Sequence, residues 1–291
     1  MKRRQIGRTD LHVNEIGYGG MSLSFSLNRP PEQESIALLQ RGVDDCGIEF
    51  IDTADAYCQS DDEMHHNERL IAKALTGARR EKVVIATKGG FIRPEGKWIP
   101  DGRPSHLREA CEESLRALAT DCIDLYQFHR PDPAVPIEES LGALNDLQTE
   151  GKIRYIGVSN FSLAQLEAAM KVAMIESLQN PLGFHMYDEE KGALLTYCEE
   201  NHITWIAYAP VGGHRNAQSL PQYTEWLTAN VGASSASPYS LALAWLLHLS
   251  PMIIPIPATT KFEHLAENMR AAGIVLTAED VEQMKHAKRV E

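Results

Sequence analysis

Short apolar runs alternate with longer amphipathic stretches along almost the whole chain. Each apolar run has the length of a buried strand and ends in polar or glycine residues. These runs are residues 15–19, 49–52, 82–87, 123–129, 153–159, 175–180, 203–208 and 252–257. Apolar positions with helical spacing lie between them, at residues 32–46, 67–76, 104–119, 136–150, 162–172, 188–201, 237–249 and 261–272. Strands that alternate with helices in this way predict parallel pairing through βαβ crossovers.

The number of these units favours a particular α/β architecture. Eight strand and helix pairs in a chain of 291 residues predict a closed (β/α)8 TIM barrel, with an open doubly wound sheet as the alternative. The segment RRQIGRTDLHVNEIG alternates around the turn-like GRTD, so we expect an N-terminal β-hairpin that closes the bottom of the barrel. Residues 277–288 resemble one more surface helix, and residues 212–236 form the longest irregular stretch, which suggests a functional loop.

Composition narrows the class of protein. Of the 291 residues 43% are hydrophobic, which is enough for one large core, and we expect a single domain over residues 1–291. The formal net charge of −12 would repel a polyphosphate backbone, so nucleic-acid binding is not expected. No apolar run approaches the length of about 20 residues that a membrane-spanning helix needs.

The first residues and the cysteines suggest a compartment. The start MKRRQIGRTDL has a basic end with no apolar segment behind it, unlike a secretory signal. Five cysteines (46, 58, 111, 122 and 198) are scattered without a CxxC pair, a pattern typical of free thiols in a reducing compartment. We therefore expect a cytoplasmic protein.

Four polar residues follow the ends of three neighbouring predicted strands. Asp52 and Tyr57 lie at the end of the second strand, Lys88 ends the third and His129 ends the fourth. The active site of such barrels lies at the carboxyl ends of the strands, so these side chains should share one rim. Taken singly, each has an ordinary interpretation: a capping Asp, a packing Tyr, a solvated Lys and a structural His.

Together, the four residues suit the protonation of a developing alkoxide. A phenol has a pKa of about 10 and is a weak acid near neutrality. A nearby ammonium lowers that pKa, and a carboxylate beside the ammonium keeps it charged and in place. An imidazole can donate to a carbonyl oxygen. Reduction of a carbonyl group needs this chemistry together with a hydride donor.

The motifs FIDTADAY, NERLIAKAL, ATKGGF, IDLYQFHRPDP, GKIRYIGVSNFS, YAPVGG and HLAEN occur in this order. In this respect the chain resembles the aldo-keto reductases over nearly its whole length. The resemblance implies an (α/β)8 barrel that uses a nicotinamide cofactor, usually NADPH, and no metal. It implies that Tyr57 is the general acid, that Lys88 lowers the pKa of Tyr57, that Asp52 supports Lys88 and that His129 polarises the carbonyl.

The same resemblance implies a set of cofactor-binding positions. Those near the nicotinamide and pyrophosphate are Gly20, Met21, Asp52, Ser159, Asn160, Gln179, Tyr208, Ala209, Pro210, Val211 and Gly213. Those near the adenosine phosphate are Ala258, Thr259, Thr260, Lys261, His264, Glu267 and Asn268. This second group opens a helix, whose N-terminal amides and dipole favour a phosphate. GYGG at 17–20 is not a GxGxxG fingerprint and predicts no Rossmann domain.

The chain departs from the family pattern at several positions. Ala258 stands where a basic residue or glycine is common, and His264 where many members have arginine. A neutral His binds a 2′-phosphate less strongly than Arg, so these two positions weaken the case for NADPH. The resemblance still makes NADPH the expected cofactor and NADH the less favoured one. Cys58 replaces the usual glycine and opens an acidic loop, residues 59–66, which should border the substrate mouth.

Two further features of the loops bear on ligands. Met21 and Trp98 are candidate substrate-wall residues, although Trp98 serves equally well as a loop anchor. His65 and His66 beside Asp61 and Asp62 suggest a metal site only weakly, because adjacent histidines do not face one another as ligands on a helix would. We expect no metal.

Three functions are consistent with these residues. The first is an NADPH-dependent reductase of aldehydes, with ketones as a secondary class, that acts as a monomer on a small-molecule carbonyl substrate. The second is an NAD(P)-dependent sugar or polyol dehydrogenase that runs the same chemistry in reverse. The third is a nucleotide-sensing regulatory subunit of a potassium channel, which is an analogy from the fold alone.

Overall fold

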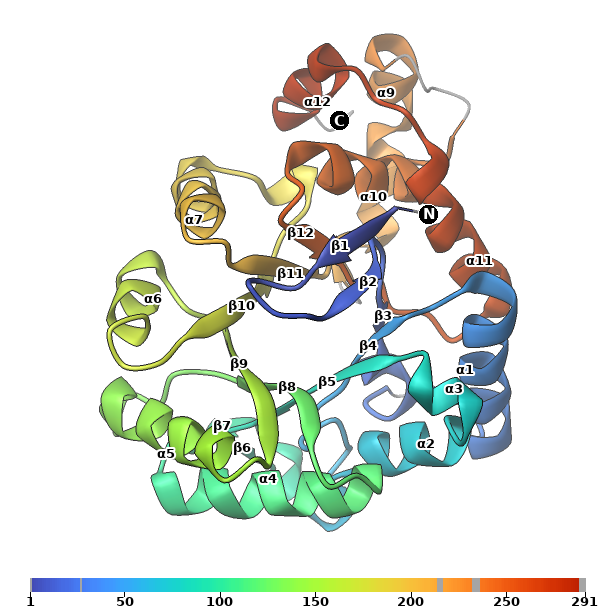
Figure 1. Ribbon diagram of the computed structural model, residues 1–291. Coiled ribbons are helices and arrows are strands. Elements are labelled where there is room, and N and C mark those ends of the chain that lie inside the picture. The colour runs from blue at the N-terminus through green and yellow to red at the C-terminus, as the bar shows by residue number, and fades with distance from the viewer. Residues whose placement is uncertain (1, 27, 214–216, 232–235, 288–291) are drawn as a thin grey trace.

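Eight parallel strands form the centre of the molecule in the computed structural model, which describes residues 2–26, 28–213, 217–231 and 236–287. In barrel order these are β3 (Tyr18–Gly19), β4 (Phe50–Asp52), β5 (Val84–Gly89), β8 (Ile123–Phe128), β9 (Ile153–Ser159), β10 (Ile175–Pro181), β11 (Thr204–Tyr208) and β12 (Ile253–Pro255). The amides of Gly17 and Gly19 donate to the carbonyls of Pro255 and Pro257 at 3.0 and 3.2 Å, which joins the last strand to the first. The predicted closed barrel is confirmed over the open sheet (Figure 1).

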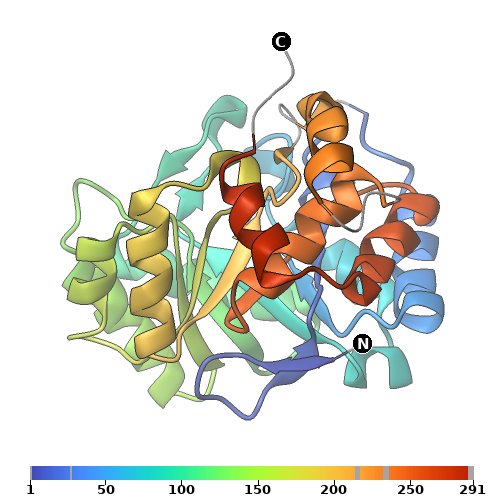
Figure 2. The same ribbon diagram turned by 90° about the horizontal axis from the view of Figure 1, so that it is seen from above.

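Helices form the outer layer of the barrel (Figures 1 and 2). They are α1 (Glu32–Cys46), α2 (His66–Ala74), α3 (Ala78–Glu81), α4 (Pro104–Leu118), α5 (Ile137–Thr149), α6 (Leu163–Ala169), α7 (Glu189–Glu200), α9 (Thr224–Asn230), α10 (Pro238–Leu249), α11 (Phe262–Arg270) and α12 (Ala278–Lys285). No helix in the described part of the chain is both long and apolar enough to cross a bilayer. Helix α10 is buried from Ser240 to Leu247 because α12 packs on its outer side, where Trp245 Nε1 donates to the Val281 carbonyl.

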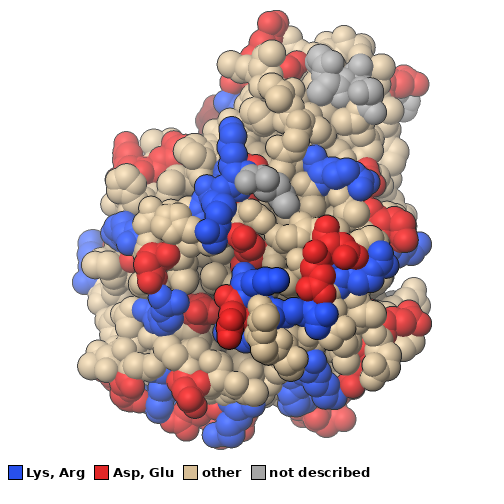
Figure 3. Space-filling model, turned by 45° about the vertical axis from the view of Figure 1, so that its right-hand side comes forward, with Lys and Arg blue, Asp and Glu red and all other residues tan. Residues whose placement is uncertain are grey.

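Acidic and basic side chains are interspersed on the face shown in Figure 3. On α1 and its neighbours, Lys73 pairs with Glu32 at 2.9 Å and Arg79 with Asp44 at 2.8 Å. Such exposed pairs each contribute between 0 and about 1 kcal/mol, so the fold depends mainly on its apolar core.

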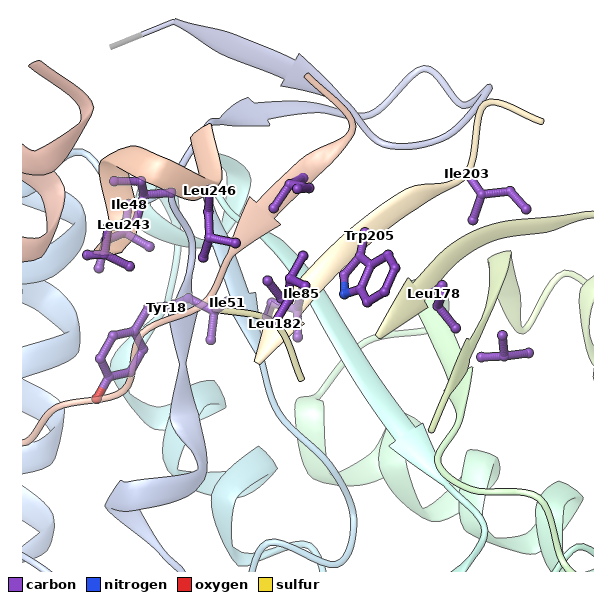
Figure 4. Packing of buried hydrophobic residues seen from close by; sticks show 14 of the residues in the cluster. Tyr18, Ile48, Ile51, Ile85, Leu178, Leu182, Ile203, Trp205, Leu243 and Leu246 are labelled. Carbon is purple, nitrogen blue, oxygen red and sulfur yellow. The ribbon is translucent and has the colours of Figure 1, made fainter. Parts of the chain in front are cut away.

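The core has two layers because neighbouring strand residues point to opposite faces of the barrel wall. Ile51, Ile85 and Trp205 point outward into the cluster shared with the helices, where Leu243 of α10 also lies (Figure 4). Their neighbours Phe50, Ala86 and Ile206 point inward and fill the barrel with Leu125 and Ile254.

The N-terminal hairpin closes one end of the barrel, as predicted. Strands β1 (Arg3–Gln5) and β2 (His12–Asn14) pair antiparallel, and Ile6, Leu11 and Val13 pack against the inward-facing barrel residues. The hairpin lies across the amino ends of the strands, seen at the bottom of Figure 2. The opposite end is therefore left for the site.

Two long connections are more ordered than the sequence indicated. The segment expected as a loop at 212–236 contains a 3₁₀ helix, Ala217–Tyr223, followed by α9; residues 214–216 and 232–235 lie outside the described residues. Leu220, Tyr223 and Leu227 are buried at helical spacing, which stabilises this segment. After β5, strands β6 (Phe91–Ile92) and β7 (Ile99–Pro100) form a short antiparallel ladder.

Candidate active site

The Lys88 ammonium is the centre of the site. Lys88 lies near the end of β5 and is fully buried. Its Nζ donates to Asp52 Oδ2 at 2.7 Å, to the Thr53 carbonyl at 2.8 Å and to the Tyr57 hydroxyl at 2.9 Å. An ammonium has three N–H donors, so all of them are used and the charge is fixed in one position.

The backbone after β4 explains the spacing between Asp52 and Tyr57. The amides of Thr53 and Asp55 donate to the carbonyls of Ala86 and Lys88, so the chain continues beside β5 beyond the end of the strand. A turn then follows, in which the Tyr57 amide donates to the Ala54 carbonyl at 3.3 Å. This turn returns the phenol to the rim beside Lys88.

Asp52 is held from the opposite side of the barrel. Its Oδ1 accepts from Gln179 Nε2 at 2.7 Å and from Gln127 Nε2 at 3.4 Å. Gln179 was expected near the cofactor; in this structure its amide nitrogen supports the carboxylate beside Lys88. Gln127 was not predicted, although it stands two residues before His129 and alternation places both on the inward face.

His129 completes the predicted group of four. Its ring centroid lies 5.8 Å from that of Tyr57, and its Nδ1 is buried without a hydrogen-bond partner among the described residues. Trp98 packs edge-on against both rings, at 6.5 Å from Tyr57 and 5.9 Å from His129, and Phe91 lies 4.7 Å from His129. Trp98 and His129 thus pack against the phenol, and Phe91 packs against both of them.

Burial controls protonation at this site. It raises the pKa of Tyr57 well above the ordinary value, and the Asp52 charge adds to this effect. The direction is opposite to the lowering expected from Lys88, because the loss of solvation outweighs the ammonium. Burial also lowers the pKa of Lys88, against the effect of Asp52, and lowers the pKa of His129 well below its usual range. Tyr57 is thus a protonated phenol and His129 a neutral imidazole near neutral pH.

Four predicted cofactor residues form a connected group on the rim next to His129, in which Asn160 Nδ2 also donates to the Ser159 hydroxyl at 3.0 Å. Asn160 adopts a left-handed backbone with φ of 61° and donates from Nδ2 to the His129 carbonyl at 3.0 Å. The Tyr208 hydroxyl donates to Asn160 Oδ1 at 2.9 Å, and the Ser159 hydroxyl donates to the Gln179 carbonyl at 2.9 Å. Tyr208 is half-buried and leaves part of its ring accessible.

The predicted pyrophosphate segment is a tight turn after β11. Ala209 has φ of 50° and Gly213 φ of 64°, and the Gly212 amide donates to the Ala209 carbonyl. Pro210 is buried within this turn, and Val211 is half-buried. The turn can therefore offer backbone groups to a ligand.

Gly20 and Met21 begin a short 3₁₀ helix after β3. A Cβ on Gly20 would lie 2.7 Å from Asn67 Oδ1 and 3.0 Å from the Asp52 carbonyl, so no larger residue fits without a shift. Met21 is 36% exposed and is free to contact a ligand.

The predicted phosphate loop leads into α11. Ala258, Thr260, Lys261 and His264 are exposed, whereas Thr259 is held by the Tyr18 hydroxyl, which donates to its carbonyl at 2.6 Å. Cationic and hydroxyl side chains around a helix N-terminus are a donor set that fits a phosphate. The residues present therefore fit an anionic dinucleotide.

Two members of the predicted set lie further along α11. Glu267 Oε1 accepts from the hydroxyls of Ser237 and Ser240 at the start of α10, so this carboxylate also joins the two helices. Asn268 is half-buried beside it.

Residues that follow Tyr57 are held by contacts with the rest of the chain. Cys58 is buried, with Sγ 3.5 Å from the Ala56 carbonyl, and does not face solvent. His65 Nδ1 and Nε2 contact Glu68 at 2.6 Å and Glu113 at 3.1 Å, whereas His66 Nδ1 contacts the Ser24 hydroxyl at 2.8 Å. The two imidazoles point to different partners.

The fold and this site define a barrel oxidoreductase, and the comparisons identify its family. Residues 15–289 match the family model described as the aldo/keto reductase family. The chain is 33% identical over 273 residues to an uncharacterised oxidoreductase, C215.11c, of Schizosaccharomyces pombe, covering 93% of this chain and 85% of that protein. The chain belongs to the aldo-keto reductase family.

Solved structures agree with this assignment. The thermostable aldo-keto reductase Tm1743, solved with the inhibitor epalrestat, is 32% identical, with a TM-score of 0.82 over 98% of this chain and 99% of that one. An aldo/keto reductase of Klebsiella pneumoniae, solved with NADP and acetate, is 26% identical, with a TM-score of 0.82 over 100% of this chain and 99% of that one. The predicted family is confirmed, and the chain is an NAD(P)H-dependent oxidoreductase.

Proposed function

We propose that the protein is an NADPH-dependent carbonyl reductase that converts aldehydes, and ketones as a secondary class, to alcohols. The observation that carries this proposal is the Lys88 ammonium, which contacts Asp52, Thr53 and Tyr57 within 2.9 Å, near the His129 Nδ1 that has no hydrogen-bond partner among the described residues. This arrangement holds a proton donor and a second polar group at one rim.

The residues act on the carbonyl oxygen of the substrate. The neutral His129 ring orients that oxygen by a hydrogen bond, and the Tyr57 hydroxyl donates its proton as negative charge develops there. Lys88, held by Asp52, stabilises the phenolate that remains. The nicotinamide cofactor, when bound, supplies the hydride. Trp98 and Met21 wall the substrate.

NADPH is the proposed cofactor. The Klebsiella relative was solved with NADP. In this chain Lys261 and His264 are exposed at the start of α11, where an additional phosphate would be stabilised. The residues that would hold the nicotinamide end are Ser159, Asn160, Gln179 and Tyr208.

The experiment is to follow the loss of NADPH absorbance with a panel of aldehydes, for wild type and for Tyr57→Phe. We expect a loss of kcat by about 10²- to 10⁴-fold in Tyr57→Phe with cofactor affinity retained, because only the proton donor is removed. Equal inactivity of both proteins on the whole panel, despite tight cofactor binding, would contradict the proposal. Turnover only with polyols and oxidised cofactor would favour the dehydrogenase instead.

We further propose that the protein is a single-domain, cytoplasmic monomer. Size-exclusion chromatography tests the monomer, and a stable tetramer would favour the channel-subunit alternative.

A further inference from the structure

Arg93 carries a buried charge that has no role in the reaction proposed above. The residue is 1% exposed, and no carboxylate forms an ion pair with it in the described part of the chain. A buried charge without a counter-ion costs free energy unless hydrogen bonds satisfy its donors. The groups that satisfy the Arg93 guanidinium therefore indicate what it holds in place.

The guanidinium holds the backbone on both sides of Tyr57. Its Nη1 donates to the carbonyl of Ala56 at 2.8 Å and to that of Cys58 at 2.9 Å, the residues directly before and after the phenol. Its Nη2 donates to the Gly96 carbonyl at 2.8 Å and the Gln59 carbonyl at 3.3 Å. One side chain thus ties the Tyr57 turn to the turn between β6 and β7.

The same guanidinium supports the aromatic wall. Its central carbon lies 4.0 Å from the ring centroid of Trp98 and 4.8 Å from that of Phe25. Trp98 in turn packs edge-on against Tyr57 and His129. The position of the indole against the proton donor therefore depends on Arg93.

We infer that Arg93 is a positioning residue for carbonyl reduction, which fixes the proton donor Tyr57 and the substrate wall Trp98 relative to each other. This inference rests on the proposed function. Only arginine suits the role, because a planar guanidinium can donate to several carbonyls in its plane while its face stacks on an indole. Lysine keeps the charge, but its ammonium is not planar and cannot donate to several carbonyls while a flat face stacks on a ring.

The test compares Arg93→Gln and Arg93→Lys with wild type and with the control Arg116→Gln, whose arginine side chain on α4 is 68% exposed. We expect kcat to fall on the order of 100-fold in Arg93→Gln, because a displacement of about 1 Å at a proton donor has that effect, and by about tenfold in Arg93→Lys. KM for aromatic aldehydes should rise while the dissociation constant of NADPH stays within about twofold of wild type, since the guanidinium stacks on Trp98, the proposed substrate wall.

Hydrogen exchange gives a readout that needs no activity. The Tyr57 and Cys58 amides donate within their own turn, to the carbonyls of Ala54 and Ala56. Their exchange should accelerate at least about tenfold in Arg93→Gln and stay unchanged in Arg116→Gln, because the turn loses its external support. If wild type reduces no carbonyl compound, the proposed function fails, and this exchange still decides whether Arg93 holds the turn.

Three outcomes would overturn the inference. One is a folded Arg93→Gln protein with wild-type exchange at residues 54–60 and wild-type kcat. Another is a parallel loss of activity and NADPH binding in proportion to unfolded protein, which is the behaviour of a purely structural residue. Where Arg93→Gln fails to fold, Arg93→Lys decides, and a kcat within about twofold of wild type at an unchanged melting temperature contradicts the role.

Discussion

The Lys88 ammonium is a buried charge whose partners make it both a structural and a chemical element. Its ion pair with Asp52 is almost fully enclosed, with the two side chains 0% and 2% exposed. Removal of one member of such a pair leaves the other uncompensated in a poorly solvated place. The effects of a substitution here should therefore appear in stability as well as in turnover.

We predict that Lys88→Met loses kcat by at least about 10²-fold, because Tyr57 loses the cation that stabilises its phenolate. The free energy of unfolding should also fall, by about 3–5 kcal/mol, because Asp52 is left without its counter-ion. Steady-state kinetics and urea denaturation check the two effects. Lys73→Met on α2 is the matched control, since that side chain is 53% exposed. An active Lys88→Met enzyme would contradict the assigned role.

Asp55 is a second buried carboxyl close to the site. Burial raises the pKa of Asp55 to about 8, Glu68 adds to this shift, and His65 and Lys88 oppose it. Its Oδ2 has no hydrogen-bond partner among the described residues. The folded protein therefore keeps this proton at pH values where the unfolded chain, with a pKa of about 3.9, has released it.

This difference in proton binding makes the free energy of unfolding depend on pH in a defined direction. Between about pH 4 and about pH 8 the folded state binds more protons at Asp55 than the unfolded state, so the residue lowers stability as pH rises. We predict that the free energy of unfolding of Asp55→Asn rises relative to that of wild type by up to about 1.4 kcal/mol per pH unit across this window. Above the window the difference should stay constant. Urea denaturation of both proteins at several pH values checks this. A difference that is independent of pH would show that Asp55 is ionised in the folded protein.

The hairpin of β1 and β2 shows what a whole element contributes. It provides Ile6, Leu11 and Val13 to the inner layer of the barrel, at the end opposite to Lys88. We predict that Ile6→Ala lowers the free energy of unfolding by about 2–5 kcal/mol, because a fully buried side chain is replaced by a cavity. Thermal denaturation checks this, with Val275→Ala as the control, since Val275 is 80% exposed.

The same variant separates the element from the chemistry. Well below its melting temperature, Ile6→Ala should keep kcat within about twofold of wild type, because Ile6 lies on the hairpin that closes the end of the barrel opposite to Tyr57. A large loss of kcat in fully folded Ile6→Ala would mean that the two ends of the barrel are coupled.

Elements with a strong periodic pattern were predictable from the sequence. The helix at 32–46 and the strand at 153–159 have the predicted bounds, because the stripe that each buries is continuous in the sequence. The ladder of β6 with β7 was not predicted, since each strand has only two residues and their pairing is between residues that are not adjacent. Helix α9 was not predicted because it buries few residues, so the sequence shows no periodic apolar pattern there.

The residues of the site also fall into those that were predictable from the sequence and those that were not. Asp52, Tyr57, Lys88 and His129 were predictable because strand ends converge in a barrel. Gln127 and Arg93 were not, because their roles depend on contacts across the barrel or between turns, such as Gln127 Nε2 with Asp52 Oδ1 at 3.4 Å. The net rise of the Tyr57 pKa was not predictable from sequence, because burial cannot be weighed against neighbouring charges without coordinates.

The molecule as a whole carries a net charge of −12, yet the proposed cofactor is itself an anion. Cofactor binding must therefore depend on local hydrogen-bond donors and positive charges that outweigh the repulsion from the overall negative charge. In the described residues these donors gather where β12 leads into α11, with exposed Lys261 and His264 near the helix start. The 2′-phosphate that distinguishes NADPH from NADH should be sensed at this place.

We predict that Lys261→Ala weakens NADPH binding by about tenfold and NADH binding by less than about twofold, because a charge-assisted hydrogen bond is lost only with the phosphorylated cofactor. Fluorescence quenching of the protein by each cofactor measures the ratio, with Lys73→Ala as the control. Added salt should weaken NADPH binding to wild type more than to Lys261→Ala, since an exposed pair is screened. Equal losses for both cofactors would place the charge of Lys261 on the shared pyrophosphate, and the preference for NADPH would then need another source.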